Sequence, residues 1–316
     1  MTTIVFMGTP DFAVGSLKTL VETGVYEITA VVTQPDRPRG RGHKLVETPV
    51  KAYALRQGLP VYQPEKVKTP EFTAQLKEWA PDLIVVAAFG QFLSQEILDI
   101  PAYGCVNVHA SLLPKYRGAA PIQYAIIKGE KETGVTIMRM EKGMDTGAMY
   151  SKVTVPIPSE MSFAELHNLL MEKGAALLVE TLPKIIAGLQ PEPQNEADAT
   201  KATLLTKAMA EIPWDRPVQE VHDLIRGFDP VPGAYTYLPD GTLLKLWESR
   251  VTDTPAGAAP GTVVKTEKDD FCVACGDKLL RILTVQPASK KRMPARVFLN
   301  GHGLKAGDRL GRQKGI

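Results

Sequence analysis

Hydrophobic and polar positions divide the chain into two parts with different periodicities. In the first part, short and fully apolar runs alternate with longer stretches in which apolar residues recur at helical spacing. Apolar runs without polar alternation are typical of parallel strands buried on both faces, and amphipathic stretches between them are typical of the covering helices. The pattern predicts an α/β fold with a doubly wound, Rossmann-like and mostly parallel sheet.

The expected elements of this part follow one another in chain order. Strands are expected at Thr3–Met7, Ile28–Thr33, Leu83–Ala88, Cys105–His109, Val135–Met140 and Tyr150–Val155. Helices are expected at about Pro10–Glu22, Val50–Gln57, Pro70–Trp79, Ala120–Lys128 and Ser162–Ala187. Thr9 is a candidate cap for the first helix, because its hydroxyl could accept a hydrogen bond from a free backbone N–H.

The pattern changes after Gly188. Residues 190–201 are polar and contain prolines, which is typical of a linker. A helix at Val218–Arg226 is followed by short strand-like runs at Ala234–Leu238, Leu243–Glu248, Gly261–Lys265, Phe271–Ala274 and Leu279–Val285. Short strands with frequent turns predict a small OB-like β-barrel. We therefore expect a catalytic domain at residues 1–189, a linker at 190–206 and a barrel domain at 207–316.

Composition limits the class of protein. With 316 residues, 44% hydrophobic and 23% charged, the chain resembles an ordinary soluble protein of two domains. No apolar run reaches the roughly 18 residues that a membrane helix needs, and a strand beginning at Thr3 leaves no room for a signal or transit peptide. Three cysteines do not make a disulfide framework, so we expect a cytoplasmic protein.

Cys272 and Cys275 form a C-x-x-C pattern that requires its own interpretation. Residues three apart on a strand face opposite ways, and the chain has no second pair of cysteines to complete a zinc site. We therefore interpret both as core or edge cysteines and expect no metal site.

The net charge of +2 is unevenly distributed. Residues 207–316 carry 17 Lys and Arg against 13 Asp and Glu, and the segment Lys290–Ile316 holds eight basic residues against Asp308 alone. The segment Pro35–Lys44 has four basic residues and one acid, with two prolines and two glycines that exclude a helix or central strand. Both segments favour contact with the phosphates of a nucleic acid, although solvated surface is the alternative.

Candidate chemistry lies at the end of the Cys105–His109 strand. Asn107 and His109 are two apart and share one face, at the carboxyl edge where open α/β sheets bind their ligands. Asp145, in the turn Gly143–Gly147, could meet His109, favour its imidazolium and relay a proton, while Asn107 donates to a developing oxyanion. Ser111 lacks a nucleophile elbow, so the set favours direct acyl transfer to an amine. The alternatives are a capped strand end and an Asx turn at Asp145.

The segment Asn107–Gly118, followed by Asp145-Thr-Gly147, resembles the motif of the folate-dependent formyltransferases. Within that family the whole chain is most similar to the members that formylate initiator methionyl-tRNA. The similarity extends to four further segments: Val5–Pro10, Gln34–Gly42, Arg226–Ala234 and Phe298–His302.

This resemblance implies transfer of a formyl group from 10-formyltetrahydrofolate to the α-amino group of initiator methionyl-tRNA. Asn107 and His109 would stabilise the oxyanion, and Asp145 would help to remove the amine proton. The folate site would comprise Phe89, Gly90, Gln91, Ser111, Leu112, Leu113 and Pro114. Contacts with tRNA are expected from Arg37, Arg39, Arg41, Lys44, Lys290, Lys291, Arg292 and Lys305. We expect a monomer without a stable protein partner.

Four other functions compete with this interpretation. A related enzyme that formylates an amino sugar nucleotide would share the catalytic residues, but it would not need the two basic segments. A glycinamide ribonucleotide formyltransferase is disfavoured because Thr9-Pro10-Asp11 replaces a small-residue phosphate loop. An RNA-binding protein with an inactive enzyme fold would not need Asn107, His109 and Asp145 together. A nicotinamide oxidoreductase is disfavoured because the G-x-G-x-x-G fingerprint is absent.

Overall fold

The computed structural model describes residues 1–39, 44–267 and 269–312, and the chain forms two compact units. Each unit gathers segments that are distant in sequence. The first contains Met1–Pro121, Thr133–Val155 and His167–Ala202, and the second contains Ile122–Glu132, Pro156–Leu166 and Thr203–Ile316.

The first unit is built on a seven-stranded sheet with the order β10-β9-β7-β6-β1-β2-β5. Its strands are β1 (Thr2–Gly8), β2 (Tyr26–Val32), β5 (Val61–Tyr62), β6 (Leu83–Ala87), β7 (Cys105–His109), β9 (Glu132–Arg139) and β10 (Met149–Pro156). The pairs β1/β2, β1/β6, β2/β5 and β6/β7 are parallel, and β7/β9 is antiparallel. The predicted doubly wound, mostly parallel sheet is therefore confirmed.

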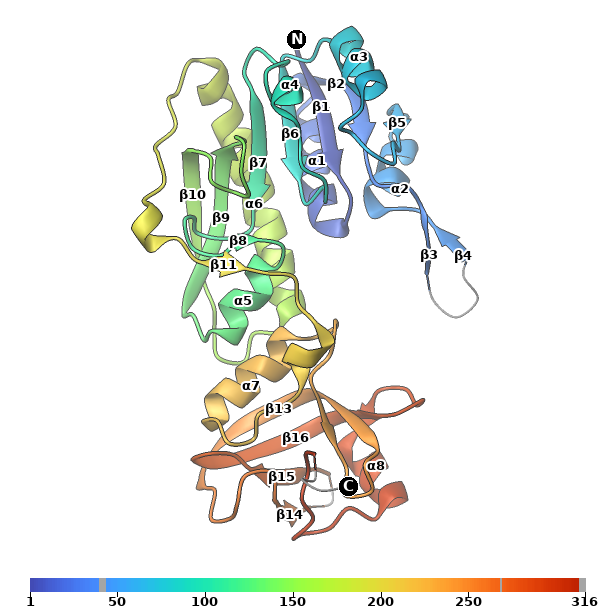
Figure 1. Cartoon of the computed structure of the whole chain (residues 1–316), viewed down its shortest axis with the longest axis vertical. Coiled ribbons are helices and arrows are strands. Elements are labelled where there is room, and N and C mark those ends of the chain that lie inside the picture. The colour runs from blue at the N-terminus through green and yellow to red at the C-terminus, as the bar shows by residue number, and fades with distance from the viewer. Residues whose placement is uncertain (40–43, 268, 313–316) are drawn as a thin grey trace. The chain divides into compact units, whose positions relative to one another are not determined.

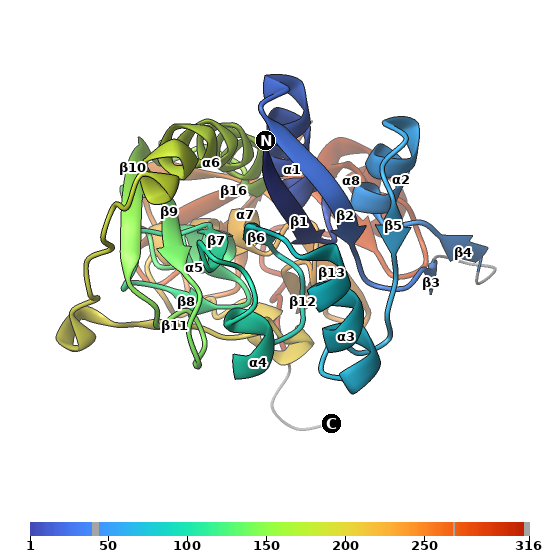
Figure 2. The same cartoon turned by 90° about the horizontal axis from the view of Figure 1, so that it is seen from above.

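Helices cover both faces of this sheet, which explains why strands such as β6 are apolar throughout. Figure 2 shows helices α1 (Asp11–Thr23), α2 (Pro49–Arg56) and α6 (Phe163–Ile186) on one face, and α3 (Pro70–Trp79) and α4 (Gln95–Leu98) on the other. Helix α6 approaches closely at Gly174, where an added Cβ would lie 3.2 Å from the side chains of Val108 and Val135. The helix thereby packs directly behind the central strand that carries the candidate site.

The second unit is built on a six-stranded antiparallel sheet (Figure 1). Its strands are β12 (Tyr235–Tyr237), β13 (Leu243–Pro255), β14 (Val263–Thr266), β15 (Phe271–Ala274), β16 (Lys278–Pro287) and β17 (Met293–Pro294). Helix α7 (Val218–Gly227) and helix α8 (Ala295–His302) contribute to its core, in which Phe228, Phe271 and Phe298 are fully buried.

The end of the chain joins the two edges of this antiparallel sheet. The backbone N–H of Gly307 donates to the carbonyl of Val263 beside β14 (2.8 Å), and that of Gly311 donates to the carbonyl of Tyr237 in β12 (2.9 Å). This closure is the barrel-like feature expected from the short strands. It also means that the basic segment is folded from Lys290 to Arg312, the part that the structure describes, with α8 and the closing segment inside it.

The remaining elements are short. They are the hairpin β3 (Arg37–Arg39) and β4 (Lys44–Val46), the pair β8 (Arg117–Gly118) and β11 (Lys201–Ala202), helix α5 (Pro121–Ile127), and the 3₁₀ turns η1 (Glu196–Asp198) and η2 (Lys207–Ala210). The segment expected to be only an exposed loop thus contains an antiparallel hairpin. The sequence pattern did not indicate it, because three-residue strands carry little periodicity.

The predicted cap of the first helix is wrong. Helix α1 begins at Asp11 with Pro10 in the cap position and no side-chain capping bond. The Thr9 hydroxyl instead donates to the carbonyl of Phe89 at 3.0 Å. It therefore ties the loop after β1 to the loop after β6, at the edge of the sheet where the candidate site lies.

The three cysteines are free and buried, and Cys272 and Cys275 belong to different apolar clusters on opposite sides of their strand. In the described part of the chain, no group of His, Cys, Asp or Glu side chains could hold a metal ion. No helix among these residues combines the length and apolar character required to cross a membrane.

Burial predicts that the native thiols are unreactive. Desolvation raises the pKa of Cys105 to about 12 and that of Cys275 to about 12, and it also raises the pKa of Cys272. At pH 8, a thiol with a pKa of about 12 is ionised in only about one molecule in ten thousand. The thiolate is the reactive form, so such a thiol reacts very slowly. We expect negligible alkylation of Cys105 and Cys275 by iodoacetamide in the native protein and full alkylation in urea. Rapid native labelling of Cys105 would contradict this account.

Candidate active site

Asn107 and His109 lie on one face of β7, where the strand reaches the carboxyl edge of the sheet. Asn107 pairs with Met138 and His109 with Thr136 of the neighbouring β9. The Asn107 side chain is half-buried, and its carboxamide makes no hydrogen bond with any residue of the described ranges. An amide at a strand end with no protein partner retains both donors for a ligand.

The imidazole of His109 is oriented by the loop that follows it. Its Nε2 lies 3.1 Å from the carbonyl oxygen of Tyr116, and its side chain is 5% exposed. A carbonyl can only accept, so Nε2 carries a proton and donates it to this bond. The other nitrogen, Nδ1, faces Asp145 Oδ2 at 3.7 Å. The ring is thus held in one tautomer, with Nδ1 available to take up a proton beside a carboxylate.

Asp145 is brought to His109 by a strained turn. Its φ of 55° lies in the left-handed region, which costs free energy for a residue other than glycine. One oxygen, Oδ2, accepts a hydrogen bond from the Gly118 N–H at 2.8 Å. Two residues later, a Cβ on Gly147 would lie 1.9 Å from the Arg139 carbonyl oxygen, so only glycine fits there. The carboxylate is therefore placed by backbone constraints on both sides of the turn.

The predicted folate segment after β7 is fastened to β9 by its backbone. The Thr136 hydroxyl donates to the Ser111 carbonyl at 2.7 Å and accepts from the Leu113 N–H at 3.1 Å. The Ser111 hydroxyl donates to the Lys115 carbonyl at 2.6 Å, which leaves it without a base and supports its exclusion as a nucleophile. Lys152 binds the Leu113 carbonyl at 2.6 Å, and the Leu113 side chain is buried. Leu112 and Pro114 lie within this same braced loop.

Phe89, Gly90 and Gln91 form the loop after β6 and lie at the same edge of the sheet. Phe89 is buried, and Gly90 has a φ of +86° that favours glycine. The Gln91 carboxamide accepts from the Val67 N–H at 3.0 Å. The Gln91 side chain and the Phe89 carbonyl thus bind neighbouring loops, so the contribution of this segment to a ligand site would come from its backbone.

Sequence reasoning missed the residues that form a cavity beside Asp145. This cavity of about 340 Å³ is lined by Lys68, Phe92, Leu93, Leu98, Met140, Glu141, Lys142, Gly143 and Met144. Phe92 and Met144 are about half exposed, and the Lys68 ammonium lies 5.5 Å from the centre of the Phe92 ring. Adjacency was the available signal, because Phe92 follows Gln91 and Met144 precedes Asp145.

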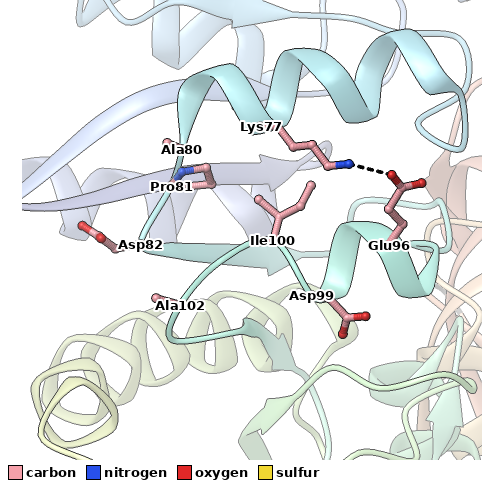
Figure 3. A pocket seen from close by; sticks show the side chains of 8 residues that line it. All are labelled: Lys77, Ala80, Pro81, Asp82, Glu96, Asp99, Ile100 and Ala102. Atoms are coloured by element: carbon pink, nitrogen blue, oxygen red, sulfur yellow. Dashed lines mark hydrogen bonds and ion pairs between the residues drawn. The ribbon is translucent and has the colours of Figure 1, made fainter.

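A second cavity, of about 630 Å³, lies at the opposite edge of the sheet (Figure 3). Lys77 and Glu96 form an ion pair of 2.8 Å at its side, and Asp82 is bound to the backbone and hydroxyl of Thr3. None of the predicted site residues lines it. Lys77, Glu96 and Asp82 are already bound to protein groups, and we assign the cavity no part in the chemistry.

The predicted tRNA-contacting residues of the second unit are exposed or half-exposed on its surface. Lys290, Lys291 and Lys305 are exposed. The Arg292 guanidinium lies 3.5 Å above the centre of the Trp247 ring and forms an ion pair with Asp229 at 2.6 Å.

Two further lysines adjoin Arg292 and were not predicted. The Lys245 ammonium lies 5.3 Å from the centre of the Trp247 ring and donates to the Pro232 carbonyl at 2.6 Å. Burial lowers the pKa of Lys245, and the neighbouring charges of Lys207 and Arg292 lower it further. Nothing in the local sequence around Lys207 or Lys245 indicated that they lie near Arg292. These three residues belong to segments that come together only in the folded unit.

The predicted tRNA-contacting residues of the first unit belong to the β3–β4 hairpin. Arg37 is exposed and forms an ion pair with Glu65 at 3.1 Å. Arg39 ends β3 and Lys44 begins β4. Arg41 lies outside the described residues.

Comparison with known proteins places this architecture in a family. The family model described as "Formyl transferase" matches residues 1–182, and the model "Formyl transferase, C-terminal domain" matches residues 204–303. This chain belongs to the formyl transferase family. The two matches together span most of both units described above.

Two relatives that are about half identical over nearly their whole length bear the same name. Methionyl-tRNA formyltransferase of Caldanaerobacter subterraneus subsp. tengcongensis is 51% identical over 306 residues, covering 96% of this chain and 98% of the relative. That of Bacillus subtilis is 51% identical over 313 residues, covering 98% of each. A solved N-formyltransferase of Helicobacter canadensis, crystallised with folinic acid and dTDP-3-aminofucose, shares the fold with a TM-score of 0.65 at 20% identity, covering 91% of this chain and all of that one.

The close approach at Gly147 generates a prediction for this formyl transferase. We expect Gly147→Ala to lower the free energy of unfolding by about 1–3 kcal/mol, because the added methyl group would overlap the Arg139 carbonyl and move the turn. The matched control is Gly301→Ala in α8, where an added Cβ meets no atom within 4 Å. That change should be neutral or stabilising by up to about 1 kcal/mol. Urea denaturation followed by circular dichroism measures both, and equal stabilities would contradict the prediction.

Proposed function

We propose that this formyl transferase transfers a formyl group from 10-formyltetrahydrofolate to the α-amino group of initiator methionyl-tRNA, for the initiation of translation. One observation carries the proposal: Asn107, His109 and Asp145 converge at one edge of the sheet, in a chain about half identical to enzymes named for this acceptor. We further propose that residues 1–189 form the catalytic domain, that 190–206 link it to residues 207–316, and that the latter hold the tRNA. The protein would act as a monomer in the cytoplasm.

The described residues fit a folate donor. The cavity beside Asp145 offers the half-exposed ring of Phe92 and the side chains of Met140 and Met144, which suit a flat aromatic ring system. Lys68 and Lys142 at the same cavity suit the carboxylates of a glutamyl tail. The two predicted segments, 89–91 and 111–114, would supply the braced backbone around it.

Asn107 is suited to stabilise negative charge during the transfer. The bound donor supplies the formyl group, whose oxygen gains negative charge as the amine adds to its carbon. The Asn107 amide makes no hydrogen bond with the described residues, so its N–H groups are free to donate to that oxygen. Because the amide is neutral, it would stabilise the negatively charged intermediate without binding the neutral product as strongly.

His109 and Asp145 form the proton-handling pair. Because Nε2 is committed to the Tyr116 carbonyl, any proton taken up or released by the ring passes through Nδ1, on the side of Asp145. The carboxylate at 3.7 Å stabilises the charged ring, and a water molecule can bridge a separation of this size. Asp145 would accept the proton that leaves the attacking amine and pass it to N10 of the folate as the bond between N10 and the formyl carbon breaks. The imidazolium of His109 would add positive charge near the oxyanion.

Phosphate contacts would hold the tRNA. Exposed cations in the second unit and in the β3–β4 hairpin offer separate points of attachment to an anionic polymer. A small acceptor would need neither group. To the residues expected from the sequence we add Lys207 and Lys245. The expected residues are Arg37, Arg39, Arg41, Lys44, Lys290, Lys291, Arg292 and Lys305.

The deciding assay measures formyl transfer from 10-formyltetrahydrofolate to charged initiator methionyl-tRNA, in parallel with an amino sugar nucleotide. Transfer to the tRNA alone is the expected result. Transfer to the sugar alone would retain the catalytic assignment and overturn the acceptor.

Removing the Asp145 carboxylate should mainly affect turnover. We expect Asp145→Asn to lower kcat by about 10²–10⁴, the usual contribution of a general base, with the KM of both substrates changed less than about threefold. The matched control is Glu78→Gln, which neutralises an exposed carboxylate on α3 that binds Gln75 and lies outside the proposed folate site. It should leave kcat within about twofold. A near-normal kcat for Asp145→Asn would remove the proposed role.

Phosphate contacts can be tested through the salt dependence of tRNA use. We expect the double variant Lys290→Ala/Lys291→Ala to raise the KM for tRNA and to reduce the slope of its logarithm against log[salt] by about one per lost contact. The control Lys18→Ala/Lys173→Ala removes two exposed lysines on α1 and α6. It lowers the net charge by the same amount as the test variant. If both double variants changed the slope equally, the effect would be one of overall charge, and the assignment would be wrong.

A further inference from the structure

The stretch from Glu192 to Ala202 is polar and linker-like in sequence, yet it is bound along the active site of the first unit. Glu192 exchanges two backbone hydrogen bonds with Met149, at 2.7 and 2.8 Å. At its other end, β11 pairs with β8 in parallel register, and the Arg117 N–H donates to the Thr200 carbonyl at 2.9 Å. The stretch therefore connects the loop after His109 with the strand that follows Asp145.

Gln194, in the middle of this stretch, binds the turn that carries Asp145. Its Nε2 lies 2.8 Å from the Asp145 carbonyl oxygen and 2.7 Å from the Gly147 carbonyl oxygen. Both partners are acceptors, so the nitrogen end of the amide must face them with one hydrogen for each. A single side chain thereby spans both ends of the short segment from Asp145 to Gly147.

Arg117 fixes the other end of the same amide. Its Nε donates to Gln194 Oε1 at 2.9 Å, and its terminal nitrogens bind the two carboxylate oxygens of Glu196 at 2.9 and 2.7 Å. The Arg117 side chain is only 9% exposed, whereas that of Glu196 is 72% exposed. The guanidinium thus uses three of its donors within the stretch, and the planar fork sets the orientation of the Gln194 amide.

These contacts form a closed loop through the candidate catalytic carboxylate. Gly118, the residue after Arg117, donates its N–H to Asp145 Oδ2 at 2.8 Å. Asp145 is therefore held at its side chain from β8 and at its backbone from Gln194. Gly118 is needed for this closeness, since a Cβ there would lie 2.5 Å from the Ala202 carbonyl oxygen. The left-handed conformation of Asp145 costs free energy, and its carboxylate is bound to the Gly118 N–H, so these contacts from outside the turn help to maintain the conformation.

We propose that Gln194 and Arg117 are positioning residues that hold Asp145 against His109, so that the linker-like stretch is a working part of the active site. The proposal rests on the function proposed above for Asp145. Neither residue touches the substrates; each acts through the place and orientation of the Asp145 carboxylate. Displacement of a reacting group by about 1 Å can cost a hundredfold in rate.

The first test replaces the amide by an apolar side chain of similar length. We expect Gln194→Met to lower kcat about 10- to 100-fold, with both KM values changed less than about threefold. Gln190→Met is the matched control, because Gln190 lies two residues before the stretch and its amide binds no described group except the Gly188 carbonyl. It should leave kcat unchanged. An unaltered kcat for Gln194→Met, or a loss confined to the KM for tRNA, would overturn the proposal.

A double-mutant cycle separates positioning from general damage. If Gln194 acts through Asp145, then Gln194→Met should cause no further loss of kcat when it is added to Asp145→Asn. An equal loss in both backgrounds would overturn the proposal. The cycle also distinguishes the two hypotheses, because the unchanged protein and Asp145→Asn by themselves test the proposed function.

A readout independent of activity uses hydrogen exchange. Backbone amides of residues 143–149 should exchange faster in Gln194→Met and remain unchanged in Gln190→Met. If Gln194→Met does not fold, Gln194→Glu provides the second variant: it keeps the acceptor for Arg117 and places a carboxylate oxygen against two carbonyls. If the amides of the turn exchanged as slowly in a folded Gln194 variant as in the unchanged protein, the proposal that Gln194 holds the turn would be overturned.

Discussion

The hydrogen bond between the Gly118 N–H and the Asp145 carboxylate joins the two halves of the candidate active site. On one side lies the loop that leaves β7, whose Tyr116 carbonyl orients the His109 ring. On the other side lies a turn whose backbone is strained at Asp145 and sterically restricted at Gly147. At 2.8 Å, this single contact sets how the carboxylate faces the imidazole across 3.7 Å. Charge-assisted hydrogen bonds of this kind are among the stronger ones in proteins, which suits a contact that must resist the strain.

The sheet determines where this contact can occur. Parallel strands have their carboxyl ends at one edge of the sheet, and this arrangement alone brings the loops after β1, β6 and β7 together there. Side chains then join these loops, as Thr9 does by binding the Phe89 carbonyl and Thr136 does by binding both Ser111 and Leu113. The result is a rigid frame in which Asn107, alone among the three proposed catalytic side chains, has no hydrogen-bond partner among the described residues. A rigid frame with one free amide is what a preorganised oxyanion site requires.

The second unit follows a different physical principle. Its cations are partly committed before any ligand arrives: Arg292 stacks on Trp247 and pairs with Asp229, and Lys245 binds the Pro232 carbonyl. Each of these contacts reduces the rotamer freedom that a long side chain would lose on binding phosphate. The lowered pKa of Lys245 reflects the repulsion and desolvation that accompany this crowding. An anionic polymer would relieve that repulsion, which gives it an advantage over a neutral partner.

The sequence by itself determined the fold class and pointed to the residues that we propose as the reacting groups. Apolar strands and amphipathic helices have strong periodicity, and the spacing of Asn107 and His109 places both on one face whatever the details of packing. Tertiary structure decided what depends on contacts between distant segments. It showed that Thr9 binds a carbonyl of another loop instead of capping a helix, and that Arg292 is paired. It also showed that Gln194, in a stretch without periodicity, holds the turn of Asp145. A polar stretch reads as a linker because its hydrogen-bonding partners are far away in sequence, and only the folded chain brings them within reach.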